Sequence, residues 1–207
     1  LGRDVENFPV KFEDKLTAPV GVFDYDQNRT YRFVVAEGKH LKNYDLSAKP
    51  VKGWKFKKAK GNIISQPQHF SVAGKDVIII SDDEGHLYQL TRAGKERFKP
   101  IKELPELKSP YYIKKGESLA TSEILSISPQ GELYVLTPGS GVDHLFLDEM
   151  RPADEFLYFD DSYIFTYENE LTVKSSGKPW TAVLDGDIGV KPKVMIFKNA
   201  FYAAAYS

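Results

Sequence analysis

Short runs of alternating apolar and polar residues fill the chain. Turn-forming residues interrupt these runs about every 8–12 residues, a spacing typical of sandwiches and propellers. The clearest run is 77–81 (VIIIS), a β-branched stretch of the kind found in strands that are buried on both faces. The segments 69–72 and 86–90 predict strands on either side of it, and 95–98 predicts a more polar fourth strand. The outermost strand of a propeller blade is the one most exposed to solvent. A buried strand followed by progressively more polar strands therefore favours a propeller blade.

The stretch 18–56 reads as a second copy of this unit. It predicts strands at 20–24, 31–36, 40–45 and 51–56. His40 matches His86 at a separation of 86 − 40 = 46 residues, and Phe23 matches Phe70 at 70 − 23 = 47 residues. Propeller blades repeat roughly every 40–50 residues, so the period supports a propeller.

Two further units and a closing pair of strands follow. The predicted strands are 123–128, 132–137 and 144–148, then 155–159, 163–167, 170–174 and 180–184, and finally 193–197 and 200–206. Residues 99–116 carry three prolines and are predicted to be a linker, neither a long helix nor a central strand. No segment shows a sustained i, i+3, i+4, i+7 apolar pattern, so the sequence predicts little or no helix.

The predicted fold is all-β, a β-propeller of four-stranded antiparallel sheets that occupies residues 1–207 as one domain. The approximate repeat units are 17–60, 61–105, 119–152, 154–185, and 190–207 together with 1–13. Residues 1–10 resemble 90–100, so the chain begins at the end of a third strand. Either the first residues pair with the last unit and close a ring of about five blades, or the chain is a partial propeller cut from a larger protein. An open array of sheets and a sandwich are the alternatives.

Composition and charge narrow the class of protein to which the chain can belong. With 207 residues, of which 42% are hydrophobic and 13% aromatic, the chain has enough apolar material for one core. The net charge of −1 provides no field that would recruit nucleic acid, and the absence of cysteine excludes disulfides and thiolate metal sites. No apolar run approaches the ~20 residues of a membrane span. Because the chain begins with Leu1 and shows no signal-peptide pattern, we interpret it as an excised or mature segment.

The segment 74–97 (GKDVIIISDDEGHLYQLTRAGKER) resembles the repeats of PQQ-like and WD-type propellers, where a buried strand is followed by Asp-x-x-Gly, an aromatic-bearing strand and a Gly turn. The segments 23–36, 51–56, 67–70 and 74–80 also resemble propeller domains of large uncharacterised envelope proteins of Bacteroidetes-type bacteria. This resemblance covers about residues 1–100 well, and the remainder only by pattern. It implies a propeller, a scaffold role in protein–protein interaction, and a periplasmic or cell-envelope location. The tryptophan-docking motifs of quinone dehydrogenases are absent, and the resemblance carries over no catalytic residue.

One candidate metal site lies between the first two strands. Asp24, Asp26 and Asn28 hold the alternating spacing of the calcium loops of integrin-type propellers, which brings alternate side chains toward one ion. Arg29 occupies the sixth position in place of glycine, and Arg32 the ninth in place of a carboxylate. The alternative is an Asx-rich turn without metal.

No catalytic motif is present. The sequence contains no G-x-S-x-G elbow, P-loop, dinucleotide fingerprint or H-E-x-x-H pair. Histidines 40, 86 and 144 recur at one place in the repeat and either surround a shared surface or cap strands at turns. The acidic pairs 82–83, 148–149, 154–155 and 160–161 lie in or next to turns, where solvation explains them.

Charge is unevenly spread along the chain. Residues 39–60 contain eight lysines, whereas nine of the ten charged residues from 143 to 170 are acidic. The candidate partner-binding residues are Lys52, Trp54, Lys55, Lys57 and Lys58. If these lysines share a face, that face suits an anionic partner; the alternative is that they protect a blade edge from unwanted strand pairing.

The leading hypothesis is a non-enzymatic propeller scaffold that binds another protein, since binding residues collect on the loops of rigid scaffolds. A glycan-binding or carbohydrate-active propeller is the alternative, and a calcium-stabilised adhesion module is the third. An enzyme is expected to place two carboxylates, or a histidine–carboxylate pair, around one pocket.

Overall fold

The computed structural model describes residues 9–107, 110–143, 153–175, 180–188, 192–197 and 200–204. Within them the chain forms five antiparallel sheets and, as its helical element, one 3₁₀ turn, η1 (Leu119–Thr121). The all-β prediction with little or no helix is therefore confirmed. The predicted strand 144–148, with His144 and the acidic pair at 148–149, lies outside the described residues, as do residues 1–8.

Each sheet is a simple meander in which consecutive strands are neighbours. The first sheet contains β1 (Gly21–Phe23), β2 (Arg32–Glu37) and β3 (His40–Tyr44). The second contains β4 (Gln68–Val72), β5 (Lys75–Ser81) and β6 (Leu87–Leu90). The third contains β7 (Tyr112–Lys114), β8 (Glu123–Ile127), β9 (Leu133–Thr137) and β10 (Gly141–Asp143). The fourth contains β11 (Glu155–Phe159), β12 (Ser162–Tyr167), β13 (Glu170–Lys174) and β14 (Trp180–Val183), and a hairpin of β15 (Lys193–Phe197) and β16 (Ala200–Ala204) follows.

The core lies between successive sheets, and β5 shows why. Its side chains alternate, so Ile78 and Ile80 pack toward the first sheet while Val77 and Ile79 pack toward the third. All four are at most 1% exposed, which explains the uninterrupted β-branched run. Full burial of such a side chain stabilises the fold by about 1.5–3 kcal/mol. A third cluster joins the third and fourth sheets in the same way.

The sheets converge along one edge. The first strands of neighbouring sheets contact each other, β1 with β4 and β7 with β11. We call the edge formed by these first strands the inner edge, and the opposite one the outer edge. Sheets that pack face to face and converge on their first strands are wedges around an axis, as in a propeller.

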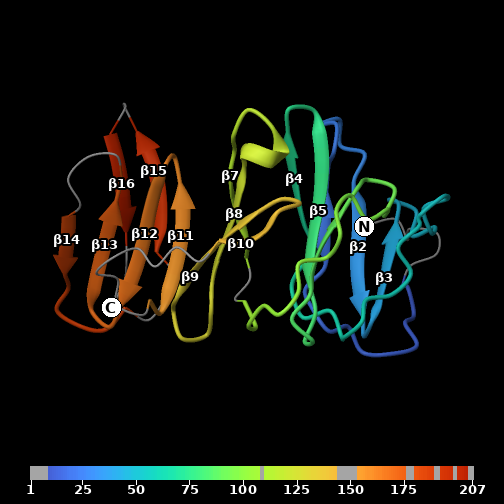
Figure 1. Ribbon diagram of the computed structural model, residues 1–207, viewed down its shortest axis with the longest axis horizontal. Helices are drawn as coiled ribbons and strands as arrows, with labels where there is room; N and C mark the ends of the chain where they lie inside the picture. Colours follow the sequence, from blue (N-terminus) through green and yellow to red (C-terminus); the bar gives the residue numbers. More distant parts are fainter. Residues whose placement is uncertain are drawn as a thin grey trace, which may run out of the picture.

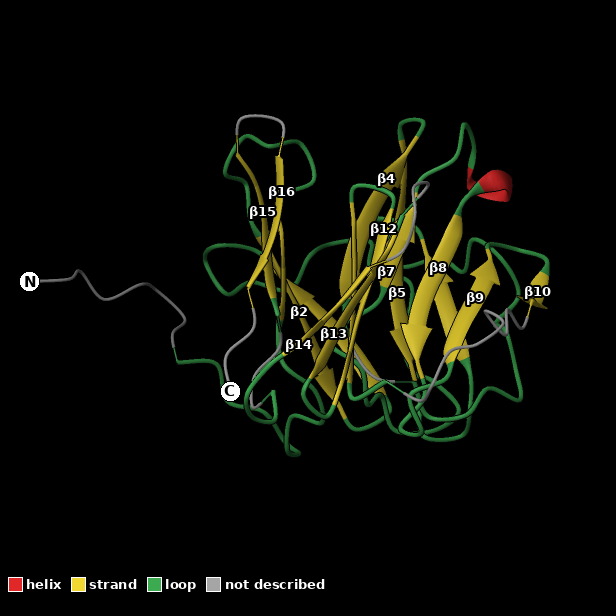
Figure 2. Ribbon diagram, turned by 90° about the vertical axis from the view of Figure 1, so that its left-hand side faces the viewer, coloured by secondary structure: helices red, strands yellow, loops and turns green. Residues whose placement is uncertain are grey.

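The ring is not closed within the described residues. Figure 1 shows the first sheet at one end of the long axis, and the fourth sheet and the β15–β16 hairpin at the other. Figure 2, turned by 90°, shows the sheets standing beside one another with their strands steeply inclined. The described sheets form an unclosed array of wedges, as in a partial propeller, and not a sandwich of two facing sheets. The expected pairing of residues 1–8 with the last unit lies outside the described residues.

Two predicted strands are not regular strands. Residues 51–56 and 95–98 lie beside β3 and β6 without forming a continuous ladder with them. The bridges Tyr44–Pro50 and His40–Lys58 flank the first segment, and the bridge Leu90–Glu96 lies in the second. In the first case Gly53, at φ +82°, turns the chain out of the extended conformation. The first two sheets therefore have three strands each and an irregular segment in the fourth position.

The proline-rich linker is more structured than its composition suggests. Ile101, Leu104 and Leu107 are buried in the core between the second and third sheets. The strand β7 begins at Tyr112, within the same segment, and forms an edge of the third sheet rather than its centre. No helix in the described part of the chain is long and apolar enough to cross a membrane.

The Asp-x-x-Gly turn of the second unit has a clear structural role. The Asp82 carboxylate, buried after β5, accepts the N–H groups of Gly61 and His86 at 2.9 Å each and the Tyr88 hydroxyl at 2.9 Å. It thereby fastens the β5–β6 turn to the segment that leads in from the first sheet. Burial alone would raise the pKa of Asp82, but these donors outweigh it and lower the pKa below its ordinary value. A Cβ on Gly85, at φ +77°, would lie 2.5 Å from a carbonyl oxygen, so glycine is required there.

Candidate functional site

The turn after β1 holds the three residues of the calcium prediction. The carboxylate of Asp24 accepts the N–H of Asn28 at 3.1 Å and that of Arg29 at 2.8 Å. The Asn28 side chain in turn accepts the N–H of Thr30 at 2.9 Å. These are the bonds of an Asx-type turn, and a cation would have to compete with the backbone donors for the same oxygens. No group of three or more histidine, aspartate or glutamate side chains suited to a metal gathers in the part of the chain that the structure describes.

Asp26, the second of these residues, belongs to a clasp between the first two sheets. Arg92 pairs with Asp26 at 2.7 Å and with Asp76, and it also donates to the carbonyl oxygen of Tyr25 at 3.1 Å. Asp76 then contacts His69, with Nε2 and Oδ1 2.6 Å apart. Burial of Tyr25 and the nearby negative charge of Asp76 raise the pKa of the Tyr25 hydroxyl above its ordinary value. His69 was not predicted as a site residue, since it does not recur in the repeat as the other histidines do.

A polar hollow of about 300 Å³ opens at the inner edge beside this clasp. Its lining residues are Val22, Phe23, Asp24, Gln66, Pro67, Gln68 and His69. The polar groups that face it are already engaged, His69 with Asp76, Asp24 with its turn, and Gln66 with the carbonyl oxygen of Val20 at 3.0 Å. His69 and Asp24 both line the hollow, so it meets the expected enzyme pattern in part, and the hydrogen bonds of both side chains serve the fold.

The predicted partner-binding residues lie on the outer edge of the first sheet, where the second sheet adjoins it. Three of them line a shallow groove of about 360 Å³, here called the lysine groove, formed by Lys55, Phe56, Lys57, Lys58, Gly94, Lys95 and Glu96. Lys95 comes from the turn after β6 and was not predicted. Lys52 is exposed but does not line the groove.

Trp54 fastens the groove rather than presenting an exposed ring. Its Nε1 donates to the carbonyl oxygen of Leu41 at 2.9 Å, and its ring packs against the first core. The ring lies so close to Gly94 that a Cβ there would be 2.8 Å from it. The N–H of Lys55 donates to the carbonyl oxygen of Ala93 at 2.9 Å, so the two walls of the groove are bonded to each other.

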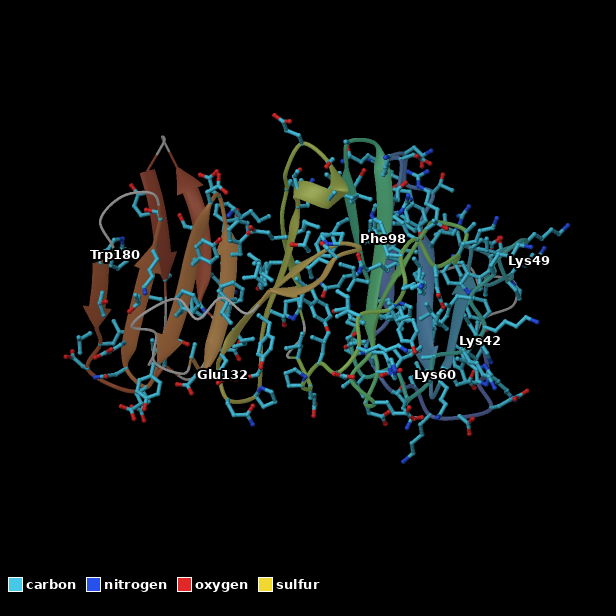
Figure 3. All side chains as sticks on the ribbon, viewed as in Figure 1. Lys42, Lys49, Lys60, Phe98, Glu132 and Trp180 are labelled. Carbon is cyan, nitrogen blue, oxygen red and sulfur yellow. The ribbon has the colours of Figure 1, made fainter. Side chains whose placement is uncertain are left out.

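The segment 49–60 carries six exposed lysines, of which three line the groove. We call this set the lysine face: Lys49, Lys52, Lys55, Lys57, Lys58 and Lys60. None of these six has a carboxylate of a described residue within 4 Å, whereas Lys39 and Lys42 pair with Glu84 and Glu37. Figure 3 shows Lys42, Lys49 and Lys60 at one end of the molecule, with Glu132 beyond the middle and Trp180 at the far end. The described acidic residues from 154 to 170 belong to β11, to the start of β13 or to the turns beside them, at the other end of the long axis (Figure 1), so the charge asymmetry of the sequence is also a separation in space.

The other two histidines in the described part of the chain act locally. His86 Nδ1 lies 3.1 Å from the carboxylate of Asp82, and His40 Nδ1 lies 3.3 Å from the carbonyl oxygen of Lys57. The first stabilises a turn and the second holds the wall of the lysine groove against β3.

Neither a protein-family model nor a curated protein sequence matches the chain. Solved structures are similar in fold. BBS1N in complex with ARL6DN shares 16% identity at a TM-score of 0.65, with 90% of this chain and 60% of that chain covered. BamB from Moraxella catarrhalis shares 15% identity at a TM-score of 0.56, with 92% of this chain and 59% of that chain covered. The computationally designed Ika8 protein shares 10% identity at a TM-score of 0.57, with 90% and 54% covered.

These likenesses establish the fold. BBS1N and BamB are β-propellers, the latter of the PQQ-like type, so the predicted propeller fold is confirmed and the resemblance to PQQ-like repeats is supported. The chain spans about three-fifths of the length of each. At such low identity the likeness shows the fold alone. The finer resemblance to envelope proteins stays a prediction.

Proposed function

We propose that this protein is a non-enzymatic β-propeller scaffold that binds a protein partner through the lysine face. The observation that carries the proposal is the set of six exposed lysines without a carboxylate partner among the described residues. Like charges held close together repel one another, and an anionic surface opposite them relieves that repulsion. The alternative, edge protection, requires charge but not a groove.

The lysine face stands on a rigid base, which suits binding. The N–H of Ala59 donates to the carbonyl oxygen of Lys39 at 2.7 Å, and Trp54 and His40 hold the segment between. A preorganised surface loses less conformational entropy when a partner docks. A propeller of similar fold, BBS1N, was solved in complex with the protein ARL6DN, which supports protein binding as a use of this architecture.

The test is quantitative co-purification from cells of the organism that encodes the protein. The triple variant K55E/K57E/K58E reverses the lysine groove, and K99E/K102E/K115E reverses three exposed lysines elsewhere as a matched control. We expect at least one protein to be captured by the wild type and the control but lost from the groove variant. Identical sets of captured proteins with all three baits would overturn the proposal. Cell fractionation checks the envelope location that the sequence resemblance implies.

A second candidate function is glycan binding at the inner-edge hollow. It is favoured by the convergence of His69, Asp24 and two glutamines on one concave surface. Val22 lines the hollow and is 56% exposed, so Val22→Trp fills the space without removing a hydrogen bond. On a glycan array this function predicts a bound glycan that is lost in Val22→Trp and retained in Val183→Trp, a change at an exposed valine of β14. An array without a bound glycan excludes it.

A further inference from the structure

We infer that the lysine groove takes an extended, carboxylate-rich peptide segment of a partner protein; this inference rests on the proposed function and names the chemistry of the partner. Lysines stand on both walls of the groove, Lys55, Lys57 and Lys58 on one and Lys95 on the other. Only one carboxylate, Glu96, lines it. The groove is therefore cationic along its length and suits a ligand that carries several separate negative charges.

The size of the groove favours an extended chain. Its volume of about 360 Å³ lies near the lower end of the roughly 300–1,000 Å³ typical of ligand sites. A helix directs successive side chains around its axis, so only some of its carboxylates can face the two walls at once. In an extended peptide successive side chains point to opposite sides, so neighbouring carboxylates reach opposite walls.

The chemistry of the walls favours carboxylates over phosphates. Protein sites for phosphate commonly use the bidentate fork of arginine, a helix N-terminus or a nest of backbone N–H groups. The residues that line the groove include no arginine and belong to no helix. Lysine acts as a single point charge, and an exposed lysine–carboxylate pair contributes little by itself, so several must act together.

The burial of the aromatic rings near the groove also argues against single-stranded nucleic acid as its ligand. Such ligands stack their bases on exposed aromatic rings. Phe56 is only 6% exposed, and the ring of Trp54 is held between Leu41 and Gly94. The groove thus offers charge without a stacking platform.

The test uses Trp54 as a reporter, because it adjoins Lys55 and packs on Gly94 in the groove. The chain has two tryptophans, so Trp180→Phe, a change at a side chain that is 46% exposed, leaves Trp54 as the only one. In this background a decaglutamate peptide is titrated while Trp54 fluorescence is followed, with decaglutamine as the uncharged control. We expect saturable binding that weakens as salt rises, since the contacts are exposed ion pairs.

Variants then locate the binding. K55E/K57E/K95E is expected to weaken decaglutamate binding at least about tenfold, and K99E/K102E/K115E to leave it within about twofold. Circular dichroism shows whether each variant keeps the β-fold. Failure of decaglutamate to bind, equal weakening by both variants, or tighter binding of an oligothymidylate of equal charge would each overturn the inference. If co-purification still depends on the groove while decaglutamate does not bind, the proposed function is supported and the inference of a carboxylate-rich peptide is wrong.

Discussion

The side-chain amide of Gln68 exchanges two hydrogen bonds with the main chain of Tyr111, 43 residues later in the sequence. Its Nε2 donates to the carbonyl oxygen of Tyr111 at 2.9 Å, and its Oε1 accepts the N–H of the same residue at 2.5 Å. Gln66, two residues before β4, donates from Nε2 to the carbonyl oxygen of Val20 before β1 at 3.0 Å. These two glutamines therefore connect the second sheet to the third and to the first along the inner edge.

Gln68→Ala is expected to lower the free energy of unfolding by about 2–3 kcal/mol, because it leaves a donor and an acceptor of Tyr111 without their partner. Urea denaturation measures the change. The control is Gln130→Ala, at an exposed position in the turn between β8 and β9, where a change within about 0.5 kcal/mol is expected. Equal effects of the two substitutions would show that the inner-edge bonds contribute nothing to stability.

Asp82→Asn should make stability depend less on pH in the acid range. The pKa of Asp82 is lower in the folded protein than its ordinary value of 3.8, so its contribution is present above about pH 4 and is lost as pH falls through the folded-state pKa. At pH 7 the substitution is expected to cost about 2–4 kcal/mol, since an amide cannot accept all the hydrogen bonds that converge there. The difference from wild type should shrink below about pH 4.

Urea denaturation at neutral and acid pH supplies the measurement for Asp82. Asp83→Asn is the matched control, because Asp83 is exposed in the same turn and its carboxylate accepts the backbone N–H and the side-chain N–H of Asn62. Its effect should stay below about 1 kcal/mol. A constant difference between wild type and Asp82→Asn from neutral to acid pH would contradict the assigned role.

Asp24→Ala distinguishes the calcium-site hypothesis from the hypothesis of an Asx-rich turn without metal. Both oxygens of Asp24 accept backbone N–H groups, and Asp26 is paired with Arg92. The substitution should therefore destabilise the protein by about 1 kcal/mol, equally with calcium and with a chelator. Thermal melting reports both quantities. A calcium-dependent rise in the midpoint of the wild type that disappears in Asp24→Ala would establish the metal site instead.

The regular part of the fold could be predicted because it is local. The run 77–81 is apolar on both faces because the strand lies between two sheets, and that is visible without a structure. The irregular outer edges could not be predicted in the same way. Residues 51–56 have a strand-like pattern, but Gly53 adopts a positive φ, and the Trp54 side chain donates a hydrogen bond to the carbonyl oxygen of Leu41 in β3.

The candidate sites were predictable only as far as one repeat contains them. Lys55, Lys57 and Lys58 stand together in the sequence, whereas Lys95 belongs to the next unit and reaches the groove through packing between sheets. His69 and Asp76 approach each other across the β4–β5 pair. This contact can be predicted only when the pairing register of β4 and β5 is known, because the spacing of His69 and Asp76 matches no catalytic motif.

Gly94 and Gly74 provide a comparison that isolates the contact between the first two sheets at the lysine groove. Both adopt positive φ, +72° and +71°, so alanine meets the same backbone strain at either position. A Cβ at Gly94 would lie 2.8 Å from the ring of Trp54, whereas nothing lies within 4 Å of a Cβ at Gly74. Gly94→Ala is therefore expected to destabilise the protein by about 1–3 kcal/mol more than Gly74→Ala, because the ring has to move against its bond to Leu41. Urea denaturation gives both values, and Trp54 emission in the Trp180→Phe background should shift only with the change at Gly94. Equal losses with unchanged emission would mean that Trp54 does not fasten the groove.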